Sequence, residues 1–168
     1  AALADLWRVS TGQEGAEPPD SGSDAWRQWL GAELARPLTP ESRTLALPPA
    51  SAETLGMFQL VGQLREEIDR QAFGTFVLSM TRSVSDVLGG YLLAKTAGLF
   101  ADTAGVESST LPIVPLFETI EDLQRAPSIM KELLSVPLVR RSVRAQGGVQ
   151  EVMKFHDQSD GEGPGVQV

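Results

Sequence analysis

The chain has no cysteine and only one histidine, and these absences exclude several kinds of active site. Without cysteine there is no disulfide, no thiolate zinc site and no thiol nucleophile, and this absence favours a cytoplasmic location. The one histidine, His156, lies in a polar stretch where no partner can be identified. It could act as a general acid or base, but a solvent-exposed histidine is the commoner explanation. Ser79, Ser83 and Ser85 have no histidine nearby that would complete a nucleophilic triad.

Positive charge and long apolar runs are also scarce. The formal net charge of −8 argues against a nucleic-acid partner, which requires a basic surface. No apolar run reaches the roughly 18 residues of a membrane span, so we expect no membrane insertion. The chain starts at Ala1 without a basic region followed by an apolar core, and we expect it to be an internal fragment. Its 168 residues suffice for one domain, but a complete (β/α)₈ barrel needs about 250 residues.

Hydrophobic spacing predicts helices in the first part of the chain. Residues 1–9 are typical of the end of a helix, and residues 24–34 of a helix with Ser23 as its N-cap. A longer helix is expected from Ser51, as its cap, to about Gln71. The tryptophans of the second helix indicate a buried face rather than a stacking platform. The stretches 10–23 and 36–50 are rich in Gly, Pro and Ser and are expected to be loops or connectors.

Two short strands are predicted, near residues 73–80 and 111–117, because both runs are apolar or β-branched. The helix between them, 84–96, has a capping-box spacing at its start and Gly98 at its end, and 99–110 is expected to be a polar loop. Strands separated by a crossover helix should pair in parallel. The sequence therefore predicts a helix-rich α/β fold. Two further helices are expected, 120–134 with Thr119 and Asp122 as a capping box, and a shorter one from Pro137.

Glu118 follows the second strand directly and is the best candidate for a functional site. Parallel α/β folds keep their sites at the carboxyl edge of the sheet. A carboxylate there can ligate Mg²⁺, which typically takes one or two protein carboxylates and completes its shell with water and substrate oxygens. The alternatives are a glutamate that caps the next helix or pairs with an arginine.

Basic side chains and a glycine-rich tail are weaker candidates. Arg140, Arg141 and Arg144 could grip a carboxylate or phosphate, although charges on a helix surface are the commoner explanation. The tail 161–165 is not a phosphate loop, since it lacks the flanking strand and helix and the Lys-Ser/Thr ending.

The amino-acid sequences of the two strand regions resemble those of the phosphoenolpyruvate carboxylase family, in its bacterial branch. The matching runs are FGTFVLSMT at 73–81, SDVL at 85–88, LLAKTAG at 92–98, VPLFETIEDL at 114–123 and QEVM at 150–153. The resemblance covers roughly residues 25–153 and is most specific at 73–123.

The resemblance implies a fold and an activity. The fold would be two consecutive strands, with their helices, of a (β/α)₈ TIM-type barrel that this chain leaves incomplete. The activity would be that of a lyase that fixes carbon dioxide, carboxylating phosphoenolpyruvate with bicarbonate to oxaloacetate and phosphate and supplying the tricarboxylic acid cycle. The family uses Mg²⁺ or Mn²⁺, its members are cytoplasmic tetramers, and arginines hold the anionic intermediates. Its PLFET glutamate is a metal ligand, a role that carries over to Glu118.

After Met153 the chain departs from the family, which continues into a Gly-Tyr-Ser-Asp-Ser segment and a lysine. The aspartate of that segment, the second metal ligand, falls at Gln158 in strict register, and Asp157 or Asp160 could replace it only in a shifted alignment. The catalytic histidine and arginines of the family fall outside this chain. We therefore expect a carboxylase-like part, 1–153, and a polar, glycine-rich, disordered tail, 154–168.

The isolated chain is accordingly expected to be inactive. The main alternative is a non-catalytic module that associates with itself or with a full-length subunit through its exposed strand edges. An unrelated acidic scaffold would require both motif matches to be accidental.

Overall fold

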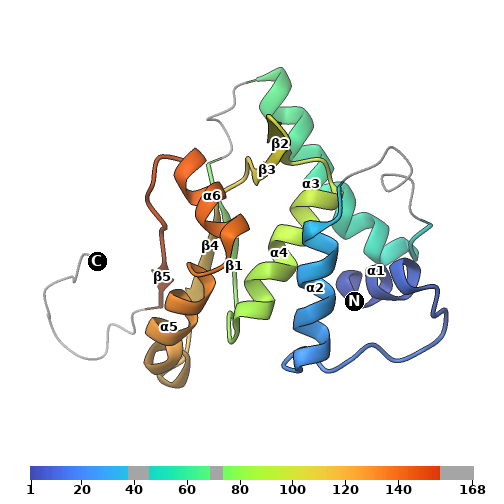
Figure 1. The fold of residues 1–168 in the computed structure, drawn as a ribbon, viewed down its shortest axis with the longest axis horizontal. Helices are drawn as coiled ribbons and strands as arrows, with labels where there is room; N and C mark the ends of the chain where they lie inside the picture. The colour runs from blue at the N-terminus through green and yellow to red at the C-terminus, as the bar shows by residue number, and fades with distance from the viewer. Residues whose placement is uncertain (38–45, 69–73, 156–168) are drawn as a thin grey trace, which may run out of the picture.

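The computed structural model describes residues 1–37, 46–68 and 74–155, and the structural statements below refer to these residues (Figure 1). In this part of the chain, helices predominate over short strands, which confirms the helix-rich α/β class. The elements are, in order, α1 Ala2–Thr11, α2 Asp24–Ala35, α3 Pro49–Glu67, β1 Phe76–Leu78, α4 Val84–Thr96, β2 Phe100–Thr103, β3 Val106–Ser109, β4 Ile113–Phe117, α5 Ile120–Leu133, α6 Pro137–Ala145 and β5 Met153–Lys154.

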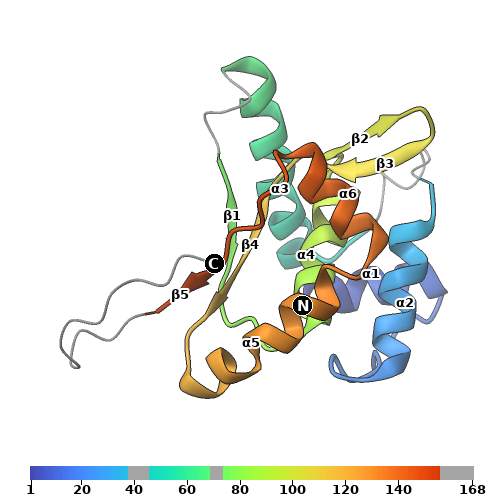
Figure 2. The ribbon, with the colours of Figure 1, turned by 60° about the vertical axis from the view of Figure 1, so that its left-hand side comes forward.

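Strands β1, β4 and β5 form a three-stranded parallel sheet in the order β1-β4-β5. Val77 pairs with Val114, and Phe117 pairs with Lys154, so the predicted parallel pairing of the first two strands is confirmed. Strand β5 includes Lys154, which the sequence analysis assigned to the tail. Helices α4, α5 and α6 lie on one side of the sheet (Figure 2). Strands β2 and β3 form a separate two-stranded sheet, and the described strands do not close into a barrel.

Helix α4 lies at the centre of the core, between the sheet and α2 (Figure 1). The helix passes close to α1 at Gly89, where a Cβ would collide with Cδ1 at the end of the Leu3 side chain, whereas a Cβ at Gly90 would make an ordinary van der Waals contact with Ile113. The tryptophans of α2 are buried against each other with ring centroids 4.7 Å apart, which confirms that they belong to the core. The main buried cluster comprises Leu6, Trp7, Trp26, Trp29, Leu30, Leu34, Val84, Val87, Leu88, Tyr91, Leu92, Ile113, Phe117, Ile129, Leu133, Leu138, Val139 and Val143.

The helix ends follow the sequence closely. The Ser23 hydroxyl accepts a hydrogen bond from the Trp26 N–H at 3.2 Å, as expected of an N-cap. Both predicted capping boxes are present, at the start of α4 and at the start of α5. Gly98 adopts a left-handed φ of 84° just after α4, which confirms it as the stop of that helix.

The predicted polar loop 99–110 is wrong, because most of it forms the antiparallel hairpin β2–β3. Ala104 and Gly105 form its two-residue turn, with φ values of 55° and 80°, the combination that suits the twist of a hairpin. The hairpin was not predicted because its strand residues are largely polar and do not show the alternation of apolar residues that indicates a strand. Ser109 is nevertheless buried, and its N–H donates to the Ser142 hydroxyl of α6 at 2.9 Å.

The prediction that Ser51 caps α3 is also wrong, since the helix begins at Pro49. The Ser51 side chain is buried and donates a hydrogen bond to Asp5 Oδ2 at 2.5 Å, which joins α3 to α1. The apolar residues Leu55 and Phe58 of α3 are buried, whereas Ile68, just after its end, is 68% exposed. The expected end of this helix near Gln71 lies outside the described residues. None of the described helices is both long and apolar enough to cross a membrane.

Lys95 of α4 is buried and uses its ammonium group to join three elements. Its Nζ donates to the carbonyls of Leu34 at 2.8 Å and Arg36 at 2.7 Å, at the carboxyl end of α2, and to Glu107 Oε2 of β3 at 2.6 Å. The Phe100 ring lies 5.7 Å from the same nitrogen. A cation is favoured at this position, because the carboxyl end of a helix carries partial negative charge.

We expect Lys95→Met to lower the free energy of unfolding by about 3 kcal/mol, because it leaves two carbonyls and a partly buried carboxylate without their donor. Lys131→Met, at an exposed position of α5, is the matched control and should change stability little. Denaturant unfolding measures both. Equal midpoints for the two variants would contradict a stabilising role for the Lys95 bonds.

Tyr91 should make the free energy of unfolding depend on pH in the alkaline range, because burial raises the pKa of its hydroxyl from 10.0 to about 12. A raised pKa means that the folded state binds the phenolic proton more tightly than the unfolded state. The contribution is therefore complete below pH 10 and is lost as pH rises from 10 to 12, by about 1.4 kcal/mol for each pH unit. The difference in the free energy of unfolding between the wild-type chain and Tyr91→Phe, measured as a function of pH, isolates the contribution of the Tyr91 hydroxyl. As the chain has one tyrosine, tyrosinate absorbance reports this group alone, and ionisation near pH 10 in the folded protein would contradict the assignment.

Candidate functional site

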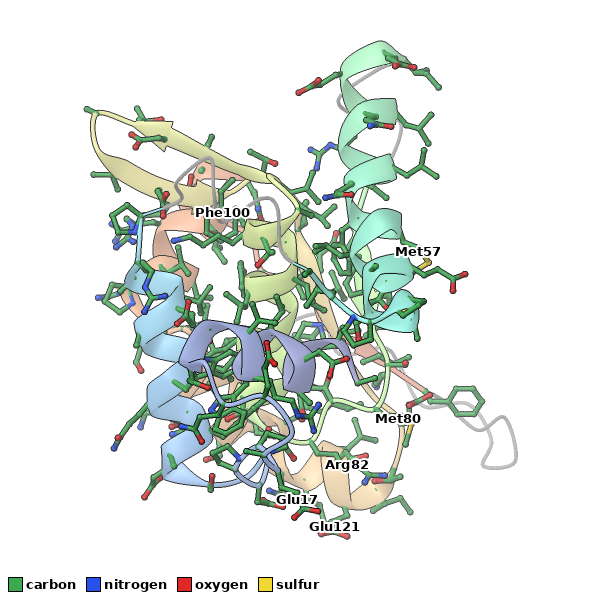
Figure 3. The ribbon with its side chains drawn as sticks, turned by 90° about the vertical axis from the view of Figure 1, so that its right-hand side faces the viewer. Glu17, Met57, Met80, Arg82, Phe100 and Glu121 are labelled. Atoms are coloured by element: carbon green, nitrogen blue, oxygen red, sulfur yellow. The ribbon has the colours of Figure 1, made fainter. Side chains whose placement is uncertain are left out.

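The carboxyl ends of the three parallel strands meet at one edge of the sheet. Glu118 directly follows β4, the middle strand, and Ser79 and Met80 follow β1. Phe155 follows β5, and its N–H donates to the Phe117 carbonyl at 3.1 Å. Figure 3 shows Met80 and Arg82 at the same end of the molecule as Glu121, in the first turn of α5. The glutamate selected from the sequence therefore lies where a parallel sheet places its site.

Glu118 is exposed, and one of its oxygens is already held by the backbone. Oε2 accepts a hydrogen bond from the Met80 N–H at 2.8 Å. The alternative that Glu118 caps the next helix is wrong, because Thr119 and Asp122 cap α5. Within the described residues Glu118 forms no ion pair with an arginine. Its second oxygen, Oε1, accepts no hydrogen bond from this part of the chain, so one oxygen is available to a ligand.

The turn between β1 and α4, which carries Met80, is held by hydrogen bonds on both sides of that residue. Thr81 is fully buried, and its N–H donates to the Leu116 carbonyl at 3.2 Å, while its hydroxyl donates to the Leu78 carbonyl at 2.9 Å. Asp86 then accepts the N–H groups of Arg82 and Ser83 at 2.9 and 2.8 Å. These bonds fix the path of the chain beside Glu118.

The donor set at this edge is suited to a hard cation but is incomplete. A single exposed carboxylate oxygen is an appropriate Mg²⁺ or Mn²⁺ ligand. No group of three or more His, Cys, Asp or Glu side chains that could hold a metal ion exists in the described ranges. His156, Asp157, Gln158 and Asp160 lie outside those ranges, as does the glycine-rich stretch 161–165. Within the described residues, Glu118 is therefore a candidate metal ligand without a surrounding group of further ligands.

The other sequence candidates are not brought to Glu118. Arg140, Arg141 and Arg144 are exposed on α6, which packs against β3. The Nε of Arg141 donates to the Glu107 carbonyl at 3.3 Å. Helix α6, which carries these arginines, lies beside β3, whose chain leads into the start of β4, whereas the β4–α5 connection lies at the other end of β4 (Figure 1). Ser83 caps α4 and Ser85 is buried, and the described residues contain no histidine.

An apolar groove between α3 and β1 was not predicted. It encloses about 410 Å³ and runs beside the outer edge of β1, with which no described strand pairs. The sequence contains no signal for this groove, because it forms between elements that become neighbours only in the folded chain. Its lining residues are Met57, Phe58, Val61, Gly74, Thr75, Phe76 and Leu111.

The fold and the site define a class of protein: a helix-rich α/β chain with a candidate metal ligand at the carboxyl edge of a parallel sheet. Comparison with known proteins is more specific. The family model for phosphoenolpyruvate carboxylase matches residues 20–161. The chain is 57% identical over 162 residues to the phosphoenolpyruvate carboxylase of Methylorubrum extorquens, covering 94% of this chain and 17% of that protein.

Other carboxylases of this name are similar over most of the chain. That of a Synechococcus strain is 43% identical over 139 residues, covering 79% of this chain and 14% of the relative. That of Ralstonia nicotianae is 36% identical over 171 residues, covering 97% and 17% respectively. The chain belongs to the phosphoenolpyruvate carboxylase family. It spans about a sixth of the length of these curated relatives.

Proposed function

We propose that this chain forms part of the active-site edge of a phosphoenolpyruvate carboxylase and that Glu118 is one ligand of its Mg²⁺ or Mn²⁺. The reaction would carboxylate phosphoenolpyruvate with bicarbonate to oxaloacetate and phosphate. The observation that carries the proposal is the position of Glu118, in a family-matched region, at the end of the middle strand of a parallel sheet. We also propose that the sheet is part of a (β/α)₈ barrel. This is supported by the helices on one side of the sheet and by the much greater length of the relatives.

The metal, when bound, would offset negative charge on the phosphorylated substrate. The contribution of this chain would be to hold it from one side through Glu118, whose carboxylate is oriented by the Met80 N–H. The described residues bring no histidine and none of the α6 arginines to this edge. Proton transfer by a histidine and any anion binding by the α6 arginines would therefore not occur at this edge, where Arg82 is the basic side chain that Figure 3 labels. We propose that the isolated chain is inactive.

The wider setting follows from the same proposal. The substrates would be phosphoenolpyruvate and bicarbonate, and the product would supply the tricarboxylic acid cycle in the cytoplasm. The complete enzyme would be a homo-oligomer, a tetramer as expected for the family, in which neighbouring chain segments cover the open sheet. This cover is needed because parallel strands are normally buried on both faces.

Titration calorimetry with Mn²⁺ tests the role of Glu118. We expect binding weaker than about 0.1 mM, because one carboxylate replaces the several ligands of a high-affinity site, and we expect Glu118→Gln to abolish it. Glu121→Gln, a nearby carboxylate with 81% of its side chain exposed, should bind like the wild-type chain. Equal heats from wild-type and Glu118→Gln protein would contradict the proposal. Oxaloacetate formation by the purified chain with Mn²⁺ and both substrates would contradict its inactivity.

A second candidate, a non-catalytic module that self-associates, is favoured by the apolar groove and the outer edge of β1. Met57 in this groove is 57% exposed, and Val77 on β1 is 40% exposed. If this candidate is correct, the apparent mass in sedimentation should rise with concentration, and Val77→Lys should lower it, because charge on an edge strand opposes pairing. Val106→Lys, on the separate hairpin, is the control. A monomer at every concentration, with cooperative unfolding, would exclude self-association.

A further inference from the structure

Met80 has a backbone conformation that its side chain does not favour. Its φ is 54°, and within the described residues the only other positive φ outside glycine belongs to Ala104 in the hairpin turn. Residues with a Cβ rarely adopt this left-handed region. Burial of the Met80 side chain cannot be the cause, because that side chain is 59% exposed. The conformation must therefore be maintained by backbone interactions of this turn.

The hydrogen bond to Glu118 accounts for this conformation. The Met80 N–H reaches Glu118 Oε2 at 2.8 Å, across the carboxyl ends of two adjacent strands and between residues 38 positions apart. The bond has a charged acceptor, which makes it stronger than a bond between neutral groups. The next residue is fixed independently by the Thr81 N–H, which donates to the Leu116 carbonyl. A left-handed residue between β1 and Thr81 is thus what turns this N–H toward β4.

We propose that Met80 is a positioning residue for the Glu118 carboxylate, acting through its left-handed backbone N–H. The bond engages Oε2, whereas Oε1 accepts no hydrogen bond from the described residues. The orientation of the Glu118 carboxylate then depends on the β1–α4 turn. That the positioned group is a metal ligand rests on the function proposed above, whereas the coupling between Met80 and Glu118 does not.

The coupling is tested by amide hydrogen exchange at residue 80, measured by NMR on the whole chain. We expect exchange to be about tenfold faster in Glu118→Ala, as loss of a bond to a charged acceptor implies. Glu118→Gln should retain most of the protection, because the amide oxygen of glutamine can accept the same bond. Glu121→Ala is the control for loss of a nearby exposed carboxylate. Equal exchange at Met80 in the wild-type chain and Glu118→Ala would overturn the proposal.

The effect of Met80 on the ligand is tested by Mn²⁺, whose paramagnetism broadens the amide signals of residues 117–119 when it binds nearby. Met80→Gly should preserve the broadening, since glycine adopts a positive φ without steric cost. Met80→Ile should reduce it severalfold, since a β-branched residue disfavours this conformation. Ala104→Ile, the same type of change at the other left-handed residue, should leave it unaltered.

The outcomes separate this inference from the proposed function. Equal broadening in Met80→Gly and Met80→Ile would overturn the positioning role. Absence of broadening in the wild-type chain, with Met80 exchange still dependent on Glu118, would refute the metal role and support the positioning of the carboxylate. Met80→Asn provides a second left-handed-tolerant variant, which should resemble Met80→Gly even if Met80→Ile does not fold.

Discussion

The enclosure of α4 is the constraint on which the rest of the structure depends. This helix separates the sheet from α1 and α2, and it passes close to α1 at Gly89, where a Cβ would meet the end of the Leu3 side chain. Glycine within a helix costs about 1 kcal/mol relative to alanine, and the apolar surface buried on both sides offsets that cost. The same helix carries Lys95, whose ammonium joins the end of α2 to the hairpin. Core packing and one buried cation thus set the relative positions of helices and sheet.

This packing determines what the carboxyl edge can do. Short connections join β1 to α4 and β4 to α5, and the capping boxes of the two helices fix the chain close to Met80 and Glu118. Hydrogen bonds fix the chain at this edge, yet the described residues contain no group of three or more side chains that could hold a metal ion. The chain spans about a sixth of the length of its relatives. Barrel enzymes collect their catalytic groups from the ends of several strands.

Much of the fold could be predicted because the signals were local. Ser23, Ser83 and Thr119 cap helices through residues three positions away, and such spacings are visible in a sequence. The hairpin was missed because its strands carry serines, threonine and acids, and its buried Ser109 is satisfied by Ser142, 33 residues later. Ser51 was assigned to a cap for the same reason: its actual partner, Asp5, is 46 residues away. Glu118 was found from its place after a strand, whereas its bond to Met80 depends on strand register.

The sequence by itself determined the helical segments, their caps, the two principal strands and the family, since each depends on short-range patterns or on matched motifs. Only the tertiary structure decided the strand order, the hairpin, the Lys95 bonds and the left-handed turn that holds Glu118. The physical reason is that these features join groups far apart in the chain. Their partners are selected by packing around α4, and composition or periodicity cannot specify that geometry.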